Sequence, residues 1–328
     1  MIELAIGAII AALVFDFLNG FHDAANSIAT IIGTRILRPL PAVAIAGAAN
    51  FVGPFLFGVA VATTIGKGII DPSFVTLNII VGALAGAIVW DIITWILGLP
   101  TSSSHALVGG ILGAGIAGAG TQAIVYAGVE KTLMGIVISP IVGLLIGFHI
   151  ALLIIWLFAK AKPNKVNSVF GKLQLVSSTY FSLTHGANDG QKTMGIIALI
   201  LLTQGVITKF EVPYYVIIMA ALAMSLGTFF GGWRIVKTMA VKITQLRPYQ
   251  GFSAETGAAT ILAVLAWLGI PASTTHAISG SIMGVGAVRR LSAVRWGVGR
   301  RIVWAWVITI PASAAVSFVI TLIIEAIK

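Results

Sequence analysis

The sequence predicts an all-α protein that crosses a membrane many times. Hydrophobic residues make up 58% of the chain and charged residues only 9%, whereas a soluble domain carries about 25% charged residues. Apolar runs of about 18 residues or more recur along the whole sequence, each long enough to span a bilayer core of about 30 Å. The runs lack the alternation typical of strands in a transmembrane barrel. They are therefore expected to be helices, because backbone groups in lipid must be hydrogen-bonded internally.

Ten apolar segments are the predicted spans or parts of spans. Judged against the length that a bilayer requires, they predict about 10–12 transmembrane elements. Two long segments, 2–34 and 173–205, each contain a polar motif and are expected to be interrupted helices. Two others, 104–120 and 275–287, are expected to be short helices. The first segment lacks the basic start and cleavage site of a signal peptide, so we expect it to be retained. The remaining predicted spans are 41–65, 74–97, 132–159, 212–232, 252–268 and 302–327.

Four clusters of basic residues between the spans predict the orientation of the chain. Short loops rich in Lys and Arg lie in the cytoplasm, so all four clusters are expected there and both termini outside. The net charge of +10 then reflects topology and not nucleic-acid binding. We expect a multi-pass protein of the cell (inner) membrane. The clusters are Arg35 and Arg38; Lys160, Lys162, Lys165 and Lys172; Arg234, Lys237, Lys242 and Arg247; and Arg289, Arg290, Arg295, Arg300 and Arg301.

Two pairs of similar motifs indicate an internal repeat. GFHDAANSIAT (20–30) resembles HGANDGQKTMG (185–195), and LPTSSSHALVGGILGAG (99–115) resembles IPASTTHAISGSIMGVG (270–286). The offsets nearly agree, at 166 for the aspartates (189 − 23) and 171 for the histidines (276 − 105). The charge clusters make the two copies cross the membrane in opposite directions.

The predicted architecture is therefore two inverted-topology repeats with broken helices that meet near the midplane, where secondary transporters bind their substrates. The first repeat and its following helix occupy 1–159, a cytoplasmic linker occupies 160–172, and the second, inverted repeat and its following helix occupy 173–328.

Asp23 and Asp189 are candidate cation ligands. Each lies inside an apolar segment and at the same position in its repeat. A charge in the bilayer core is costly, so such carboxylates usually face a cavity or an ion. Oxygen ligands suit a hard cation such as Na⁺, and Asn26, Asn188 and Thr193 supply amide and hydroxyl oxygens nearby. The alternative is that both carboxylates only cap broken helices.

Two runs of Ser and Thr are candidate phosphate ligands. Each run follows a proline, Pro100 or Pro271, and precedes a short helix. Ser and Thr favour the helix N-cap, and the free N–H groups and dipole of a helix N-terminus attract anions. Simple capping is the alternative interpretation. The hydroxyl candidates are Ser102, Ser103, Ser104, Ser273, Thr274 and Thr275.

The remaining polar side chains of the motifs complete the predicted site. Asn26, Gln191 and Lys192 are further candidate phosphate ligands. Four histidines, His22, His105, His185 and His276, are expected to support the site by hydrogen bonding or titration. No two histidines have the i, i+4 spacing with a carboxylate that a zinc site of a metalloprotease requires.

Hydrogen phosphate with a cation suits paired carboxylates better than sulfate does. Bound cations neutralise the carboxylates, and hydrogen phosphate keeps a P–OH group that can donate to one of them. The expected function is import of inorganic phosphate by symport with Na⁺, or alternatively H⁺, without an organic cofactor. A sulfate or metal–phosphate carrier and a passive anion channel remain alternatives. An intramembrane aspartyl protease is disfavoured because both aspartates lack the G-x-G-D context.

The four motifs resemble those of the inorganic phosphate transporter family, whose signature is a duplicated G-A-N-D-x-A-N motif. Here it reads Gly20 to Ser27 and Gly186 to Thr193, and the second pair reads Pro100 to His105 and Pro271 to His276. The resemblance implies a phosphate symporter that uses Na⁺ or H⁺, with two inverted repeats and a homodimer as one assembly. It makes Asp23, Asn26, Asn188 and Asp189 ligands of cation and phosphate.

The chain departs from that family pattern at three positions. His22 stands where the first motif usually has Asn, and Gln191 and Lys192 stand where the second often has Ala and Asn. Lys192 can therefore replace a cation or pair with phosphate, which bears on the choice of coupling ion. The short segment between the halves is typical of a compact prokaryotic member.

Overall fold

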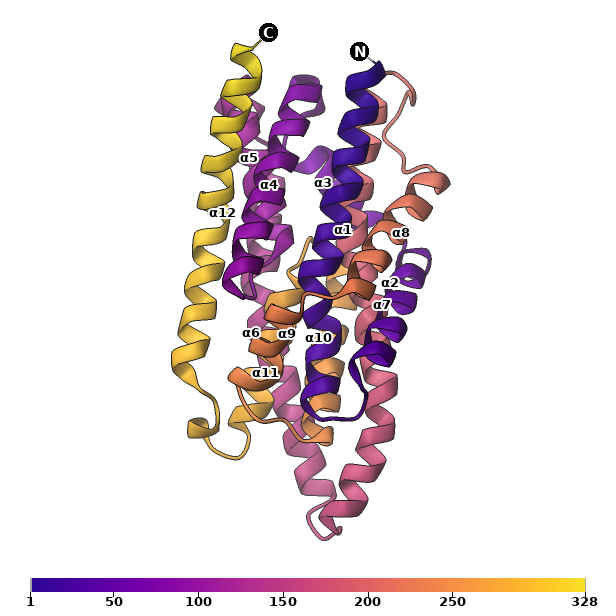
Figure 1. Cartoon of the computed structure of the whole chain (residues 1–328), viewed down its shortest axis with the longest axis vertical. Helices are drawn as coiled ribbons and strands as arrows, with labels where there is room; N and C mark the ends of the chain where they lie inside the picture. The colour runs from indigo at the N-terminus through magenta and orange to yellow at the C-terminus, as the bar shows by residue number, and fades with distance from the viewer. Residues whose placement is uncertain (1, 328) are drawn as a thin grey trace.

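The computed structural model describes residues 2–327, and these residues form an all-helical membrane protein (Figure 1). Short 3-10 and π turns connect some of the helices. The helices are α1 Ile2–Gly33, α2 Pro39–Phe57, α3 Ala60–Gly68, α4 Leu77–Leu97, α5 Ser103–Ala119, α6 Tyr126–Leu157, α7 Pro163–Thr203, α8 Tyr214–Phe230, α9 Trp233–Lys237, α10 Pro248–Trp267, α11 Thr274–Ala287 and α12 Trp296–Ala326.

By length and composition, five of the described helices can cross a membrane alone, and a bent pair raises the number to six. The five are α1, α2, α4, α6 and α12, and the bent pair joins α8 to the segment Trp233–Lys242 at an angle of 58°. The helical membrane class predicted from composition is confirmed, while the count of about 10–12 elements, which rests on spans of bilayer length, stays a prediction.

The two long polar-centred helices are continuous, so the predicted interruptions of 2–34 and 173–205 are wrong. α1 runs unbroken for 32 residues and α7 for 41. Their polar side chains bond mainly to side chains of neighbouring helices, which leaves the backbone ladder of α1 and α7 intact. α7 also begins at Pro163, which fits the first turn of a helix, so most of the segment 160–172 is helical and not a loop.

The breaks occur instead at glycines in the shorter spans. The predicted span 41–65 divides into α2 and α3 at Gly58, whose φ of 74° lies in the region that favours glycine. Gly231, with a φ of 68°, ends α8 in the same way. A positive-φ glycine is a common helix terminator, and these two end the corresponding helices, α2 and α8, of the two halves.

Two helical hairpins end inside the molecule. In the first, α4 and α5 turn at residues 98–102, and Trp306 in the middle of α12 donates to the carbonyl of Pro100 at this tip, at 3.0 Å. In the second, α10 and α11 turn at residues 268–273, and Gly135 of α6 lies directly against Pro271. The N-termini of α5 and α11 therefore start in the interior and not at a surface.

Helices from the two halves of the chain are interleaved. α1 packs on α8 and α2 on α7; likewise, α5 packs on α12 and α11 on α6. The two contacts in each set are equivalent, because α7 and α8 stand six helices after α1 and α2, and α11 and α12 stand six helices after α5 and α6. In Figure 1 the two termini lie at one end and the α6–α7 connection at the other, so α1 and α7 run in opposite directions.

Small residues permit these close contacts, as is common between membrane helices. A Cβ on Gly113 of α5 would overlap the backbone of Ala314 on α12. The outward face of α12 carries exposed apolar side chains such as Val307 and Leu322, while Ser313 and Ser317 face inward. The burial pattern is that of a helix with one face in hydrocarbon.

We expect Gly113→Leu to lower the stability by about 1–3 kcal/mol, the usual cost of overpacking a tight contact. The added side chain must push α5 away from α12. Gly7→Leu is the matched control, because within residues 2–327 nothing lies within 4 Å of a Cβ at this exposed position of α1. Thermal unfolding of the purified protein in detergent measures the difference, and equal midpoints for both variants would contradict this packing.

Candidate functional site

The N-termini of α5 and α11 meet in the interior. Ser102 caps α5 by accepting from the backbone N–H of His105 at 3.3 Å, and Ser273 caps α11 by accepting from that of His276 at 3.1 Å. The rings of His105 and His276 lie edge to face with centroids 4.2 Å apart. Both predicted runs of Ser and Thr therefore begin helices, and both face the same central region.

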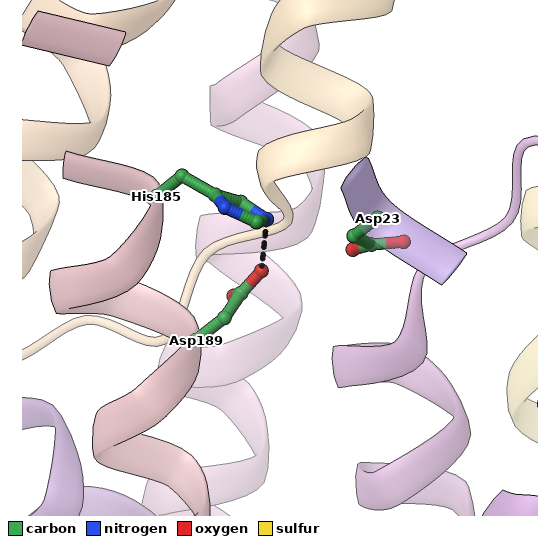
Figure 2. Close-up of side chains that lie close together, drawn as sticks. All are labelled: Asp23, His185 and Asp189. Carbon is green, nitrogen blue, oxygen red and sulfur yellow. Dashed lines mark ion pairs between the residues drawn. The ribbon is translucent and has the colours of Figure 1, made fainter. Parts of the chain in front are cut away.

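Asp23, His185 and Asp189 form the centre of the site (Figure 2). They come from α1 and α7, and one ligand atom of each lies within 4.8 Å of the others. All three side chains are at most 1% exposed. His185 Nε2 pairs with Asp189 Oδ2 at 3.2 Å, across from Asp23. The two repeated aspartates thus lie together although 166 residues separate them (189 − 23).

Protein groups surround both oxygens of Asp189. Lys192 contacts Oδ1, and Ser104 donates to the same oxygen at 3.2 Å. Thr274 donates to Oδ2 at 2.8 Å. The carboxylate therefore joins α7 to the N-termini of both short helices.

Asp23 has fewer partners. His22 Nδ1 lies 2.7 Å from Oδ1, and Thr275 donates to Oδ2 at 3.3 Å. Asn26 donates its amide to Thr275 at 2.9 Å and to Thr274 at 3.2 Å. Its own oxygen, Oδ1, is buried and has no hydrogen-bond partner among residues 2–327. The Asp23 carboxylate and the Thr275 hydroxyl thus meet here, and the amide that donates to Thr275 carries an unpartnered oxygen; oxygen atoms of these kinds suit a hard cation.

Three predicted ligands make no hydrogen bond to either aspartate: two of them bond elsewhere and one has no partner. Asn188 donates to the carbonyl of Leu262 on α10 at 3.0 Å. Gln191 accepts from the backbone N–H of Val61 at 2.8 Å and so satisfies the start of α3. The Thr193 hydroxyl is buried and, in the described part of the chain, unpartnered.

The structure buries further polar residues that were not predicted as site residues, among them three carboxylates and one asparagine. Glu255 of α10 accepts from Thr30 at 2.6 Å and from Gln174 at 3.1 Å, and it also contacts Ser177. The other three are Asp16, Asn19 and Asp91, at most 2% exposed. An ionisable residue inside an apolar span is itself a functional signal, but these lie outside the repeated motifs on which the sequence analysis concentrated.

Two of the missed carboxylates adjoin the same centre. Asp16 neighbours Asn19 and Thr193 and lies near Asp189 and Lys192. Asp91 neighbours Ser103 and His22. Within residues 2–327 neither carboxylate has a partner at hydrogen-bonding distance. In the described part of the chain the buried side chains include five carboxylates but one lysine and no arginine, a balance that favours bound cations or protons.

We expect Ser273→Ala to cost about 1 kcal/mol of stability, because it removes the cap of α11. Ser279→Ala, in the same helix and equally buried, is the control, since the Ser279 hydroxyl has no partner in the described residues. Ser273→Thr should keep the cap and the stability. Thermal unfolding midpoints test this, and a Ser279→Ala loss as large as that of Ser273→Ala would contradict the capping role.

Comparison with known proteins places the chain among phosphate transporters. A profile described as "Phosphate transporter family" matches residues 19–317. The chain is 56% identical over 315 residues to a "Probable low-affinity inorganic phosphate transporter" of Rhizobium meliloti (strain 1021), covering 96% of this chain and 94% of the relative. It is 42% identical over 330 residues to a protein of the same description from Bacillus subtilis (strain 168), covering 100% and 99%.

A solved structure agrees with these relatives. "The sodium-dependent phosphate transporter" superimposes with a TM-score of 0.89 at 27% sequence identity, covering 99% of this chain and 100% of that one. The match extends over both hairpins and both aspartate-bearing helices. On its sequence, its fold and its paired motifs, the chain belongs to the phosphate transporter family.

Proposed function

We propose that this protein imports inorganic phosphate across the cell membrane by symport with a cation, with Na⁺ favoured and H⁺ as the alternative. The observation that carries the proposal is the convergence of two buried aspartates, Asp23 and Asp189, with the N-termini of α5 and α11. Family membership and the names of the relatives support phosphate as the substrate.

Phosphate would bind between the two short helices. Their N-termini supply free N–H groups and the positive ends of two dipoles. The hydroxyls of Ser103, Ser104, Thr274 and Thr275 add donors and acceptors without a net charge; the Ser103 hydroxyl is buried and unpartnered among residues 2–327. A P–OH group of hydrogen phosphate can donate to a carboxylate, which sulfate cannot do at neutral pH. The proposed ligands also include the capping residues Ser102 and Ser273.

The cation would bind at Asp23, whose carboxylate accepts from the Thr275 hydroxyl, and Asn26 would add its amide oxygen, which has no partner among residues 2–327. Oxygen ligands of this kind fit Na⁺, and the structural relative is named for sodium dependence. Asn188 and Thr193 remain proposed ligands for another step of the cycle, since neither bonds to the aspartates here. Coupling to H⁺ would instead use His22 or His185, which contact the two carboxylates.

Two inverted repeats would exchange conformations to open the site to either side. The recurring helix pairs and the opposite directions of α1 and α7 support this arrangement. We keep the proposed extents of 1–159 and 173–328 for the halves, joined through 160–172, although that joining segment is mainly helix. A homodimer and contact with lipid also belong to the proposal.

Reconstituted protein should accumulate radiolabelled phosphate under an inward Na⁺ gradient, with little competition from sulfate. Asp23→Asn should reduce this uptake about tenfold or more, the scale that a coupling free energy of about 1–3 kcal/mol allows. Asp71→Asn is the control, because this acid is exposed and serves only as the cap of a short 3-10 turn. The assay compares Na⁺, H⁺ and choline gradients in proteoliposomes.

Each alternative has its own signature in that assay. Uptake driven only by H⁺ would reassign the carboxylates and histidines as proton carriers. Phosphate flux that ignores every gradient would favour a passive channel. Equal competition by sulfate would favour a broader anion carrier, and unchanged uptake in Asp23→Asn would remove the proposed cation site.

The proposed orientation puts the α6–α7 connection in the cytoplasm and the 204–213 loop outside. The chain contains no cysteine, so a single introduced cysteine reports its own position. We expect Lys162→Cys to react with a membrane-impermeant maleimide only after cells are opened, and Val206→Cys to react in intact cells. Both positions are exposed. The reverse labelling pattern would show that the topology is opposite to the proposed one.

A further inference from the structure

We propose that the Lys192 ammonium is a built-in cation that takes, beside Asp189, the place of a transported cation in the second half of the chain. The first half, at Asp23, would then keep a site for a transported cation. The inference rests on the proposed symport function and concerns its stoichiometry. It also changes the role of Lys192 from a phosphate ligand to a fixed counter-charge.

The ammonium is surrounded by the oxygen ligands that a cation would use. Lys192 Nζ contacts the carboxylate of Asp189 and the hydroxyl of Ser104, and it donates to the carbonyl of Ala272 at 3.0 Å. These oxygens come from α7, from α5 and from the turn before α11. An ammonium has three N–H donors and no acceptor, so three oxygens satisfy it. The side chain is 1% exposed, and all of its donors are used without phosphate.

The corresponding place in the first half lacks a lysine. Lys192 follows Asp189 by three residues, and Asn26 follows Asp23 by three. The partner hydroxyl corresponds as well, because Ser104 and Thr275 each directly precede the histidine of their motif. Thr275 donates to Asp23 at 3.3 Å, as Ser104 does to Asp189 at 3.2 Å.

The two halves therefore offer similar oxygen ligands with different occupants. At Asp189 a tethered ammonium fills the set. At Asp23 the Asn26 oxygen is left without a partner in the part of the chain that the structure describes, and the nearby nitrogen is His22 Nδ1, at 2.7 Å from Oδ1. That nitrogen belongs to an imidazole, which carries a positive charge only when it is protonated, whereas the Lys192 ammonium is a permanent partner of Asp189.

Charge balance links this difference to transport. An anion entering beside two aspartates needs compensating positive charge, because buried charges that are not paired are costly. Lys192 supplies one such charge and cannot leave with the substrate. The number of cations carried per phosphate should accordingly be one lower than in a variant that lacks the ammonium.

Replacing the lysine should create a second site for Na⁺. We expect the thermal midpoint of Lys192→Asn in detergent to rise with Na⁺, against choline, by at least about 5 °C more than that of the wild type over a hundredfold range of Na⁺. Lys209→Asn is the matched control, since Lys209 is exposed and lies in an outer loop. Its response should equal that of the wild type.

Lys192→Met removes the charge but keeps an unbranched side chain, so it should show the same gain of Na⁺ response if Lys192→Asn fails to fold. Double-label uptake of sodium and phosphate should give one more Na⁺ per phosphate in the variant than in the wild type. The inference is overturned if wild type and both variants respond equally to Na⁺. It is also overturned if both variants are unfolded and Na⁺ does not restore their fold. A wild type without phosphate uptake would defeat the proposed function, while the binding result would still decide the role of Lys192.

Discussion

Burial of charge in the membrane interior is the constraint on which this structure depends. A carboxylate in hydrocarbon must find donors or cations, and Asp189 finds them on three different elements: Lys192 on its own helix, Ser104 on α5 and Thr274 on α11. The contacts with Ser104 and Thr274 hold the N-termini of α5 and α11 against α7. The polar network thus also connects the two hairpins to each other through α7.

The two hairpins that end in the interior give that network its anion-binding character. Because α5 and α11 start in the interior, their unpaired N–H groups point to the same region as the aspartates. Close packing makes the geometry possible, since glycines such as Gly113 let α5 lie directly against the backbone of α12. Binding of an anion and binding of a cation are therefore properties of one set of side chains, which is the physical basis for coupling them.

Much of the helix pattern could be predicted from the sequence, because long apolar runs and Ser or Thr caps are local signals. The predicted helices 104–120 and 275–287 differ by about one residue from Ser103–Ala119 and Thr274–Ala287. The interruptions predicted in α1 and α7 were wrong for a non-local reason. Polar motifs break a membrane helix only where neighbours do not satisfy them, and here side chains such as Thr275 and Ser104 do so.

The sequence by itself determined the membrane class, the duplicated motifs and the pairing of Asp23 with Asp189, because composition and repeated motifs are properties of the linear sequence. Only the tertiary structure decided which oxygens meet which charges. It put Lys192 on Asp189, left the Asn26 oxygen without a partner among residues 2–327, turned Gln191 toward α3, and brought Asp16 and Asp91 to the same centre. Apart from Lys192 with Asp189, which are one helical turn apart, these contacts join residues far apart in sequence and depend on how helices pack, so no local pattern encodes them.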